Sequence, residues 1–405
     1  MNKRFWLTNV LLETGFSYND NGINGTNTDI YNLLIEGGKI IDIQKGKLEK
    51  IDTEAIDAKG LLALPSFVDK HIHLDKGFYG GPWTASTPFI SVFERIKEEE
   101  EFLPKFLDFT TERAESLLEL ITMSGVTHAR VQCNVDPIIG LKNVERVRAA
   151  LESYKDKLTY ELVAFPQHGL LRSNSVPLMK EAMKNGVNLV GGLDPATIDN
   201  DIEASLNAMM DIAIEYNSDV DIHLHDGGKL GMYTIKRLTE LVEEAKWQGR
   251  VTISHAYCMG DSTLKEVEDI AERLSELNIS IATTVPINIQ APPIPLLYKK
   301  GVKVHVINDN INDHWSPFGT GDLLQRASRM AERFDWIDEY SLTRALGFIT
   351  DGKVPLDSQG KQAWPKVGDE ANIVLLEASC SAEAIARRSK RNAVMFKGKI
   401  LLGNF

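Results

Sequence analysis

The chain of 405 residues is poor in the features that mark several large classes of protein. It contains only three cysteines, Cys133, Cys258 and Cys380, and no Cys-x-x-Cys pair, which excludes a disulfide framework and a zinc ribbon. No apolar run approaches the length of a membrane span, and the apolar stretch behind the basic N-terminus is short and is broken at Asn9. We therefore expect a protein of the reducing cytoplasm.

Positive charge is also scarce, because Asp and Glu outnumber Lys and Arg by 57 to 45 and the net charge is −12. This balance disfavours nucleic acid and anionic membrane surfaces as partners. A glycine-rich phosphate loop is missing as well, since neither Gly191-Gly192 nor Gly227-Gly228 matches a dinucleotide-binding fingerprint.

The middle of the chain alternates buried-looking strands with amphipathic helices, which is typical of a parallel α/β fold. One helix is predicted to start near Thr110 and to stop at Gly125, with Ala114 and Leu117 on its apolar face. The acidic run at residues 98–101 is interpreted as the solvated face of another helix. Eight strand–helix units favour a closed, TIM-like (β/α)8 barrel. The predicted strands are residues 64–73, 126–133, 160–167, 187–193, 219–225, 250–255, 280–286 and 302–308.

Both ends of the chain differ from this middle region. Residues 32–43 have the pattern of a hairpin around Gly37-Gly38, and the C-terminus is again β-rich. These patterns predict one small sheet domain built from residues 1–60 and 366–405, with the barrel formed by residues 61–365.

Metal-type ligands stand at the ends of four predicted strands. His71 and His73 close the first strand, and His223 lies near the end of the fifth. His255 ends the sixth strand and Asp309 follows the eighth. Strand residues two positions apart share a face at about 6.5 Å, from where two imidazoles can reach one ion at about 2.0–2.1 Å. Because barrel enzymes assemble active sites at the C-terminal ends of their strands, the pattern predicts a metal-dependent hydrolase.

Longer motifs around these residues resemble the amidohydrolase superfamily, and within it the cytosine-deaminase-like branch. The motifs are HIHLDK at 71–76, VAFPQ at 163–167, VGGLDPAT at 190–197, HLHD at 223–226, VTISHA at 251–256 and DNINDHWSPFG at 309–319. The resemblance covers essentially the whole barrel and both ends. It implies a distorted (β/α)8 barrel with a β-sandwich made from the two termini.

The resemblance also implies a site with one divalent metal ion, zinc or iron. The residues that would hold the ion are His71, His73, His223 and Asp309. His255 would lie beside the water that the ion activates, and Gln167 is similar to the substrate-binding Gln of the cytosine deaminases. The fourth strand has no lysine, whereas binuclear amidohydrolases typically carry a metal-bridging carboxylated lysine there. We therefore expect a mononuclear site.

The chain departs from the cytosine deaminases at several positions. Gln132 and Asn134 stand where relatives often carry His and Asp near the end of the second strand. Asp226 stands in place of a Glu and Asn310 in place of an Asp, and the triazine-type members of the branch match better at both. The differences predict that cytosine itself is a poor substrate.

The implied reaction removes an amino or alkylamino group from a nitrogen heterocycle of s-triazine or pyrimidine type by attack of a metal-activated water. Asp309 can be both metal ligand and proton acceptor, and Asp226 can donate or shuttle a proton to the ring. His255 can hydrogen-bond the attacking water, although a buried structural histidine is its alternative.

Five further residues are candidates for substrate contacts. Gln132 and Asn310 are expected to line the site. His225 shares a strand face with His223, where it either contacts substrate or supports a ligand. Lys76 either anchors a ring carbonyl or is an ordinary loop lysine, and Trp315 either walls the pocket or only packs. The histidines expected to be structural or peripheral are His128, His168, His305 and His314.

Three other functions stay open: a cytosine deaminase proper, a cyclic-amide hydrolase, and a non-catalytic metal- or ligand-binding member of the fold. The lysine-free fourth strand disfavours the second, and the complete set of ligands and carboxylates disfavours the third. A zinc deaminase of flipped bases is disfavoured because the His-x-Glu and Pro-Cys-x-x-Cys signature is absent. We expect a homo-oligomer that binds a small heterocyclic substrate.

Overall fold

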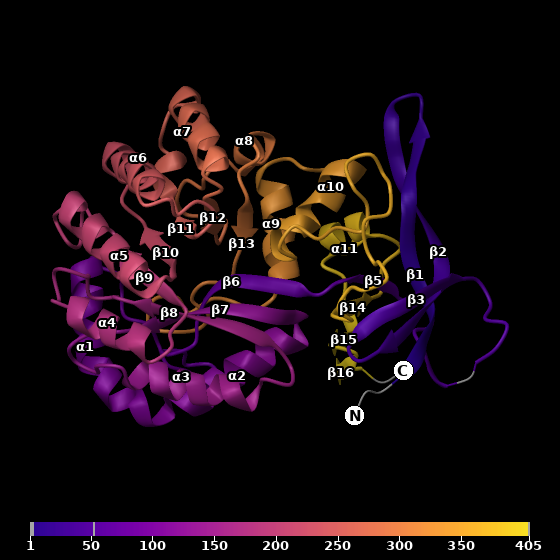
Figure 1. Cartoon of the computed structure of the whole chain (residues 1–405), viewed down its shortest axis with the longest axis horizontal. Coiled ribbons are helices and arrows are strands. Elements are labelled where there is room, and N and C mark those ends of the chain that lie inside the picture. The colour runs from indigo at the N-terminus through magenta and orange to yellow at the C-terminus, as the bar shows by residue number, and fades with distance from the viewer. Residues whose placement is uncertain (1–3, 52, 404–405) are drawn as a thin grey trace.

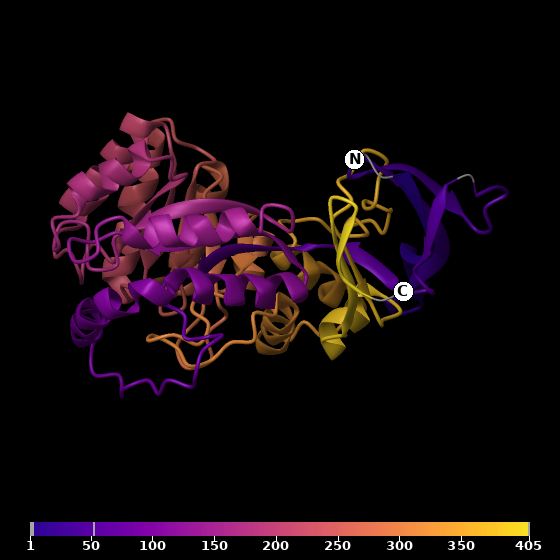
Figure 2. The same cartoon turned by 90° about the horizontal axis from the view of Figure 1, so that it is seen from below.

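The computed structural model describes residues 4–51 and 53–403 and contains two sheets (Figure 1). One is a ring of parallel strands surrounded by helices, and the other is built from both ends of the chain. Seen from below, the ring and the terminal sheet lie at opposite ends of the molecule, and both chain termini lie at the terminal sheet (Figure 2).

The ring of strands is the predicted barrel. Its eight strands are hydrogen-bonded in the order in which they follow one another along the chain, and every ladder between them is parallel. This is the strand arrangement of a (β/α)8 barrel. The strands are β6 (Phe67–His73), β7 (Val126–Asn134), β8 (Thr159–Phe165), β9 (Leu189–Leu193), β10 (Asp219–Leu224), β11 (Val251–His255), β12 (Ser280–Thr283) and β13 (Val304–Val306). All eight predicted strands are present, with ends that differ by a few residues.

The barrel closes between β6 and β13 through a short seam. Because β13 has only three residues, the two ends meet in a bridge between Ile72 and Asp309. The Asp309 N–H donates to the His71 carbonyl at 2.9 Å. The buried carboxylate of Asp69 adds a second link by accepting a hydrogen bond from the Asn308 side chain at 2.9 Å. The seam therefore places Asp309 directly beside the histidines of β6.

The first predicted strand is divided in the structure. Its beginning belongs to β5 (Leu62–Pro65), which pairs with β1 (Arg4–Asn19) and β14 (Ile373–Leu376) of the terminal sheet. The barrel strand β6 begins at Phe67. The chain passes from one sheet to the other at Ser66, inside a continuous apolar run that conceals the change. The division of the chain into residues 1–60 with 366–405 and residues 61–365 stays a prediction.

The terminal sheet has the strand order β16-β15-β14-β5-β1-β2-β3, with β4 beside β1. The predicted hairpin is confirmed, since β2 and β3 pair on either side of Gly37 and Gly38, which have φ angles of 59° and 80°. Side chains from distant strands, such as Leu33 and Met395, meet in one core. The described residues of the two termini form a single sheet, where the resemblance implies a β-sandwich. The remaining strands are β1 (Arg4–Asn19), β2 (Gly22–Glu36), β3 (Lys39–Lys45), β4 (Glu54–Asp57), β14 (Ile373–Leu376), β15 (Arg391–Phe396) and β16 (Lys399–Leu402).

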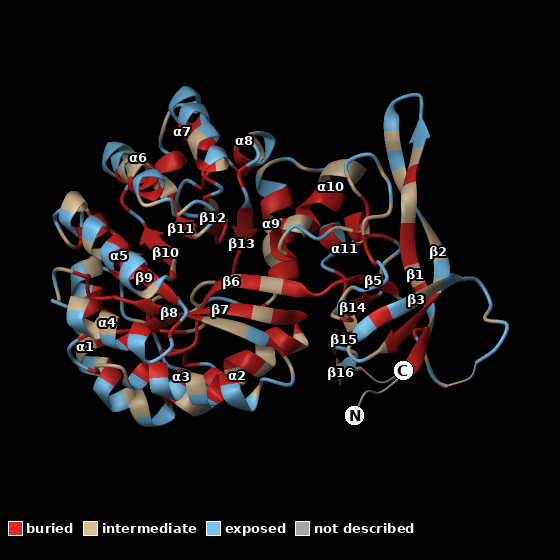
Figure 3. Cartoon of the chain, in the orientation of Figure 1, coloured by how far each residue is buried: buried red, intermediate tan, exposed pale blue. Residues whose placement is uncertain are grey.

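Helices cover the outside of the barrel, with buried faces toward the strands and exposed faces toward solvent (Figure 3). The helix predicted near Thr110 is α2, and it buries Ala114 and Leu117 as expected. The described helices are α1 (Val92–Phe106), α2 (Thr110–Met123), α3 (Lys142–Ser153), α4 (Val176–Lys184), α5 (Ile202–Tyr216), α6 (Gly228–Glu244), α7 (Leu264–Glu276), α8 (Ile294–Lys299), α9 (Leu323–Arg333), α10 (Glu339–Ala345) and α11 (Ser381–Arg387). None of them is both long and apolar enough to span a membrane.

The interpretation of residues 98–101 as a solvated face is wrong for one residue. The run lies in α1, and Glu101 is exposed, but Glu99 is completely buried. A continuous run of four acidic residues extends around more than one side of a helix, so at least one of them turns inward.

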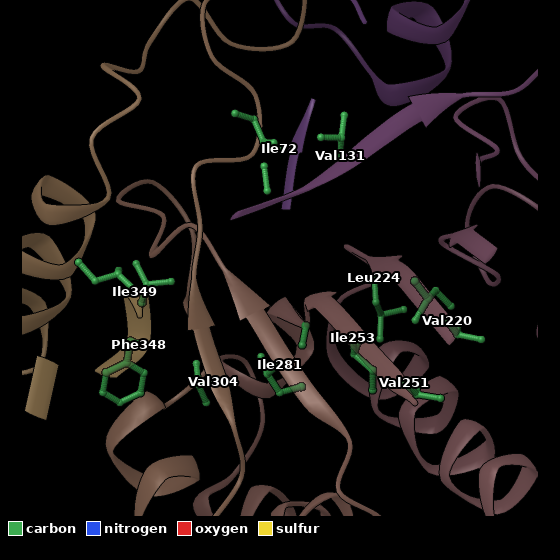
Figure 4. Packing of buried hydrophobic residues seen from close by; sticks show 14 of the residues in the cluster. Ile72, Val131, Val220, Leu224, Val251, Ile253, Ile281, Val304, Phe348 and Ile349 are labelled. Carbon is green, nitrogen blue, oxygen red and sulfur yellow. The ribbon is translucent and has the colours of Figure 1, made fainter. Parts of the chain in front are cut away.

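A large apolar core joins the barrel strands to the surrounding helices. In Figure 4, Val251 and Ile253 of β11 lie beside Ile281 of β12 in this cluster. Burial of apolar surface at about 25 cal/mol per Å² is the main force that holds such a barrel together. The core gives the strand ends, and the side chains on them, a rigid support.

Candidate metal centre and active site

Five side chains from the strand ends converge at one mouth of the barrel. The Nε2 atoms of His71 and His73 each lie 3.4 Å from Asp309 Oδ1. His223 Nε2 lies 3.3 Å from His73 Nε2. Two atoms that bind one ion at about 2.1 Å with tetrahedral geometry are about 3.4 Å apart, so these spacings suit a single divalent ion.

His255 belongs to the same group in space. The ligand atoms of His71, His223, His255 and Asp309 all lie within 4.8 Å of one another. The Nε2 atoms of His71 and His255 are buried, and neither has a hydrogen-bond partner among the described residues. Buried polar atoms are normally satisfied; an ion bound at His71 Nε2, with the water that it activates beside His255 Nε2, would satisfy both. The donor set therefore fits the cation that the resemblance implies.

Burial and neighbouring charge determine the protonation of these groups. Burial lowers the pKa of His223 well below its usual value, and the nearby ring of His71 lowers it further. Burial alone would raise the pKa of Asp309, but His255 and His71 hold it well below its usual value. For His71, burial lowers the pKa, yet Asp221 and Asp309 outweigh it and raise the pKa to about 9. A cation and a proton therefore compete for His71.

The backbone turns sharply where the strands end. The φ angles are 74° at His255, 48° at Ala256 and 63° at Asp309. All three lie in the left-handed region, which residues other than glycine rarely adopt. Such conformations cost about 1–3 kcal/mol each and collect at functional sites. Here they occur at two of the five converging residues.

A buried polar chain supports His71 at its other nitrogen. Ser254 Oγ lies 2.8 Å from His71 Nδ1 and donates to Asp221 Oδ1 at 2.7 Å. Arg130 donates to the second oxygen of Asp221 at 3.0 Å. The Gln132 amide also lies 3.2 Å from His71 Nδ1. The structure thus places Gln132, a predicted substrate contact, beside the His71 nitrogen that does not face Asp309.

Lys76 is completely buried, which excludes the reading as an ordinary loop lysine. Its Nζ donates to Gln167 Oε1 at 2.6 Å and lies 3.4 Å from Glu99 Oε1. Burial would lower the pKa of Lys76, but the charges of Glu99 and Asp75 raise it above its usual value. The ammonium group is therefore retained. Because Lys76 occupies the oxygen of the Gln167 amide, the NH2 group of that amide is left to donate.

His225 and Asp226 are both held by Asp194, which follows β9. Asp194 Oδ2 lies 2.8 Å from His225 Nδ1, and Asp194 Oδ1 accepts the Asp226 N–H at 3.1 Å. The His225 ring stacks on His255 with centroids 4.2 Å apart, so it borders the converging group. The Asp226 carboxylate accepts the N–H groups of Ala196 and Thr197 at 2.9 and 3.1 Å. In this arrangement Asp226 connects the loops after β9 and β10, while its burial raises its pKa.

The segment after β13 carries Asn310 and Trp315. The Asn310 side chain donates to Asp313, whose other oxygen accepts the Trp315 N–H at 2.8 Å. The Trp315 indole N–H donates to Glu99 Oε2 at 2.6 Å, and the Lys76 ammonium lies 5.5 Å from its ring centre. Trp315 therefore borders the Lys76 side of the site.

Three supporting carboxylates were not predicted from the sequence. Asp221 lies two residues before His223 on the same strand face, and Asp194 directly follows the fourth strand, so strand spacing contained a signal for both. Glu99 gave no such signal, because its neighbours in the chain are also glutamates. The other histidines lie outside the converging group: His128 contacts Thr159, His314 contacts Glu98, and His168 and His305 are buried elsewhere.

The chain belongs to the amidohydrolase family. The model of the amidohydrolase family matches residues 109–401. An Escherichia coli (strain K12) protein named uncharacterized protein YahJ is 43% identical over 404 residues, which cover 99% of this chain and 88% of that protein. The predicted membership of the superfamily is thereby confirmed, and the chain is a hydrolase acting on carbon–nitrogen bonds.

Two solved structures that resemble the chain indicate the branch of the superfamily to which it is similar. The structure of N-isopropylammelide isopropylaminohydrolase from Burkholderia multivorans ATCC 17616 superposes with a TM-score of 0.87 and 31% identity, covering 99% of both chains. That of 5-methylcytosine deaminase from Klebsiella pneumoniae gives a TM-score of 0.80 and 25% identity, covering 98% of both chains. Both belong to the branch that the motifs indicated.

Proposed function

We propose that the chain is a metal-dependent aminohydrolase that removes an amino or alkylamino group from a nitrogen heterocycle of s-triazine or pyrimidine type. The observation that carries the proposal is the convergence of four side chains: Nε2 of His71 and of His73 each lie 3.4 Å from Asp309 Oδ1, and His223 Nε2 lies 3.3 Å from His73 Nε2. A single zinc or iron ion held by these four residues would supply an activated water as nucleophile.

The chain's own residues divide the remaining work. One carboxylate oxygen of Asp309 lies 3.4 Å from both histidines of β6. The second oxygen of Asp309 is left to accept a proton from the attacking water. His255 borders the same space and can hydrogen-bond that water or the oxygen that develops charge. Asp226, with a raised pKa, can supply the proton that the departing amine needs once it moves off the Ala196 and Thr197 amides.

The substrate side of the site is rich in hydrogen-bond donors. Lys76 carries a retained ammonium group, and the Gln167 amide has its NH2 group left to donate. Oxo groups and ring nitrogens are acceptors, so the pair favours a ring with several of them, such as a hydroxylated triazine. His225, Asn310 and Trp315 are proposed to border the ring.

A second candidate function is that of a cytosine-type deaminase, which the likeness to 5-methylcytosine deaminase supports. We also propose that the enzyme works in the cytoplasm as a homo-oligomer, with a small heterocycle as its partner and neither nucleic acid nor membrane. The acidic net charge of −12 supports the last point.

The proposed function is tested by a screen for release of ammonia or alkylamine from triazines, pyrimidines and purines. We expect turnover of at least one oxo-triazine carrying an amine or alkylamine, and loss of that turnover in His73→Ala. A purified, metal-loaded enzyme that releases amine from none of these rings would refute the proposal.

A further inference from the structure

Glu99 differs from every other residue of the acidic run in α1. It is completely buried, whereas Glu101 two positions later is exposed. Its Oε1 accepts the Asn134 side-chain amide at 2.5 Å and lies 3.4 Å from Lys76 Nζ. Its Oε2 accepts the Trp315 indole N–H at 2.6 Å. One carboxylate thus connects α1 to the last residue of β7 and to the segments that follow β6 and β13.

A buried carboxylate is costly unless its charge and its hydrogen bonds are satisfied. Burial would raise the pKa of Glu99, but the charge of Lys76 and the hydrogen bonds from Trp315 and Asn134 hold it below its usual value. The glutamate is therefore an anion, and it is the nearest counter-charge to the Lys76 ammonium group.

The helix that carries Glu99 also packs against the mouth of the barrel. Ile96, one turn before Glu99, forms a small buried cluster with Phe165 and Leu193, and Trp315 packs against that cluster. The Phe165 ring in turn stacks on the His223 ring, with centroids 3.9 Å apart. α1 therefore covers the site from the side of Lys76 and Trp315.

We propose that Glu99 is a positioning residue that holds α1 over the site and fixes Lys76 and Trp315 where they meet the substrate ring. The proposal rests on the proposed function, because it assigns the substrate-facing role to these two side chains. Glu99 acts through them and touches no reacting atom.

The arrangement has a consequence for specificity. With its charge balanced by Glu99, Lys76 remains free to donate to Gln167 Oε1, and that bond determines which end of the Gln167 amide faces the ring. Removing the negative charge of Glu99 should disturb the lysine, the orientation of the amide and the indole together. The loss should be largest for rings that present oxo groups.

The test compares Glu99→Gln with Glu101→Gln, which makes the same change in charge at an exposed position of the same helix. The measurements are amine release from N-isopropylammelide, metal content, and hydrogen exchange of residues 92–106. We expect Glu99→Gln to lower kcat/KM at least about tenfold, to keep the wild-type metal content, and to speed exchange in α1. Glu101→Gln should stay within about twofold of the wild type in all three. A Glu99→Gln enzyme that behaves like Glu101→Gln overturns the proposal.

A double mutant separates positioning from a general effect on folding. If Glu99 acts through Lys76, adding Glu99→Gln to Lys76→Gln should lower kcat/KM by less than about threefold. Independent, multiplying losses would contradict the proposal.

If Glu99→Gln does not fold, Trp315→Phe is the alternative variant, because it removes only one hydrogen bond of Glu99. Unchanged hydrogen exchange in α1 of Trp315→Phe would then overturn the proposal. If the wild type releases no amine from any ring, the proposed function fails, while the exchange comparison still decides whether Glu99 holds α1.

Discussion

At the scale of the residue, Asp309 and His255 occupy the same small space with different partners. Asp309 places one oxygen 3.4 Å from both histidines of β6. His255 stacks on His225, and its Nδ1 lies 3.3 Å from the Tyr257 hydroxyl. We propose that Asp309 is a metal ligand and that His255 acts on the attacking water.

These partners predict different results for the two residues. Asp309→Asn should lose metal and activity together, because a neutral amide is a poorer ligand and a poor proton acceptor. His255→Ala should keep the metal and lose about 10²–10⁴ in kcat, the range typical of general acid–base groups. Elemental analysis and steady-state kinetics on both variants check this. Because His255 also lies within 4.8 Å of the ligand atoms, loss of metal from His255→Ala would show that it is a ligand.

Cytosine is predicted to be a poor substrate. Asp226 is one methylene shorter than the glutamate of the cytosine deaminases. Lys76 donates to the Gln167 oxygen, and we propose that this pair presents donors where the amine edge of cytosine needs acceptors. Mismatched buried polar groups cost about 1–3 kcal/mol each, so two of them predict a disadvantage of about a hundredfold or more in kcat/KM relative to ammelide-type rings. A substrate panel that ranked cytosine first by a wide margin would refute this account of the donors.

At the scale of the element, the barrel strands share a charged network beneath the site. Arg130 of β7 donates to Glu161 of β8 and to Asp221 of β10, both at 3.0 Å. The guanidinium group is nearly buried. Removing it would leave the negative charges of Glu161 and Asp221 without this positive partner. Through Asp221 and Ser254 the network reaches His71.

Arg130→Met should therefore destabilise the protein by about 3–5 kcal/mol at neutral pH, the cost of breaking a buried pair. Arg237→Met is the control, since its partners lie on the surface and such pairs contribute about 0–1 kcal/mol. Burial raises the pKa of Glu161, but His128 and Arg130 hold it well below its usual value. The ionised Glu161 therefore adds to the free energy of unfolding above about pH 4.5, and this stabilisation is lost as the pH falls. Urea unfolding at two pH values measures both effects, and equal losses for the two variants would contradict the prediction.

The strands and the main ligand positions followed from the sequence because strand periodicity and strand ends are local features. His71, His73 and His223 end apolar runs, and the barrel rule brings such ends together. The break at Ser66 was not predictable, because the apolar run continues across two sheets. Glu99 was hidden among equivalent glutamates, since only the position of α1 above the site decides which of them turns inward. Gln132 was predicted to face substrate, but strand spacing does not say which atom of a converging cluster it will meet.

At the scale of the whole molecule, the terminal sheet depends on both ends of the chain. Deletion of residues 380–405 would remove β15 and β16 and with them core residues such as Met395, which pack with Leu33 and Phe5 of the N-terminal strands. The exposed apolar face should aggregate, so we expect insoluble protein. Solubility and activity of the truncated chain check this, and a soluble, fully active truncation would refute the pairing of the two ends.

The proposed chemistry depends on a single divalent ion held by three histidines and one aspartate. Elemental analysis of protein purified gently from metal-replete medium measures it most directly. We expect about one zinc or iron ion per chain, lost together with activity in His73→Ala, because β9 has no lysine to bridge a second ion. Two firmly bound ions per chain, or none, would contradict it.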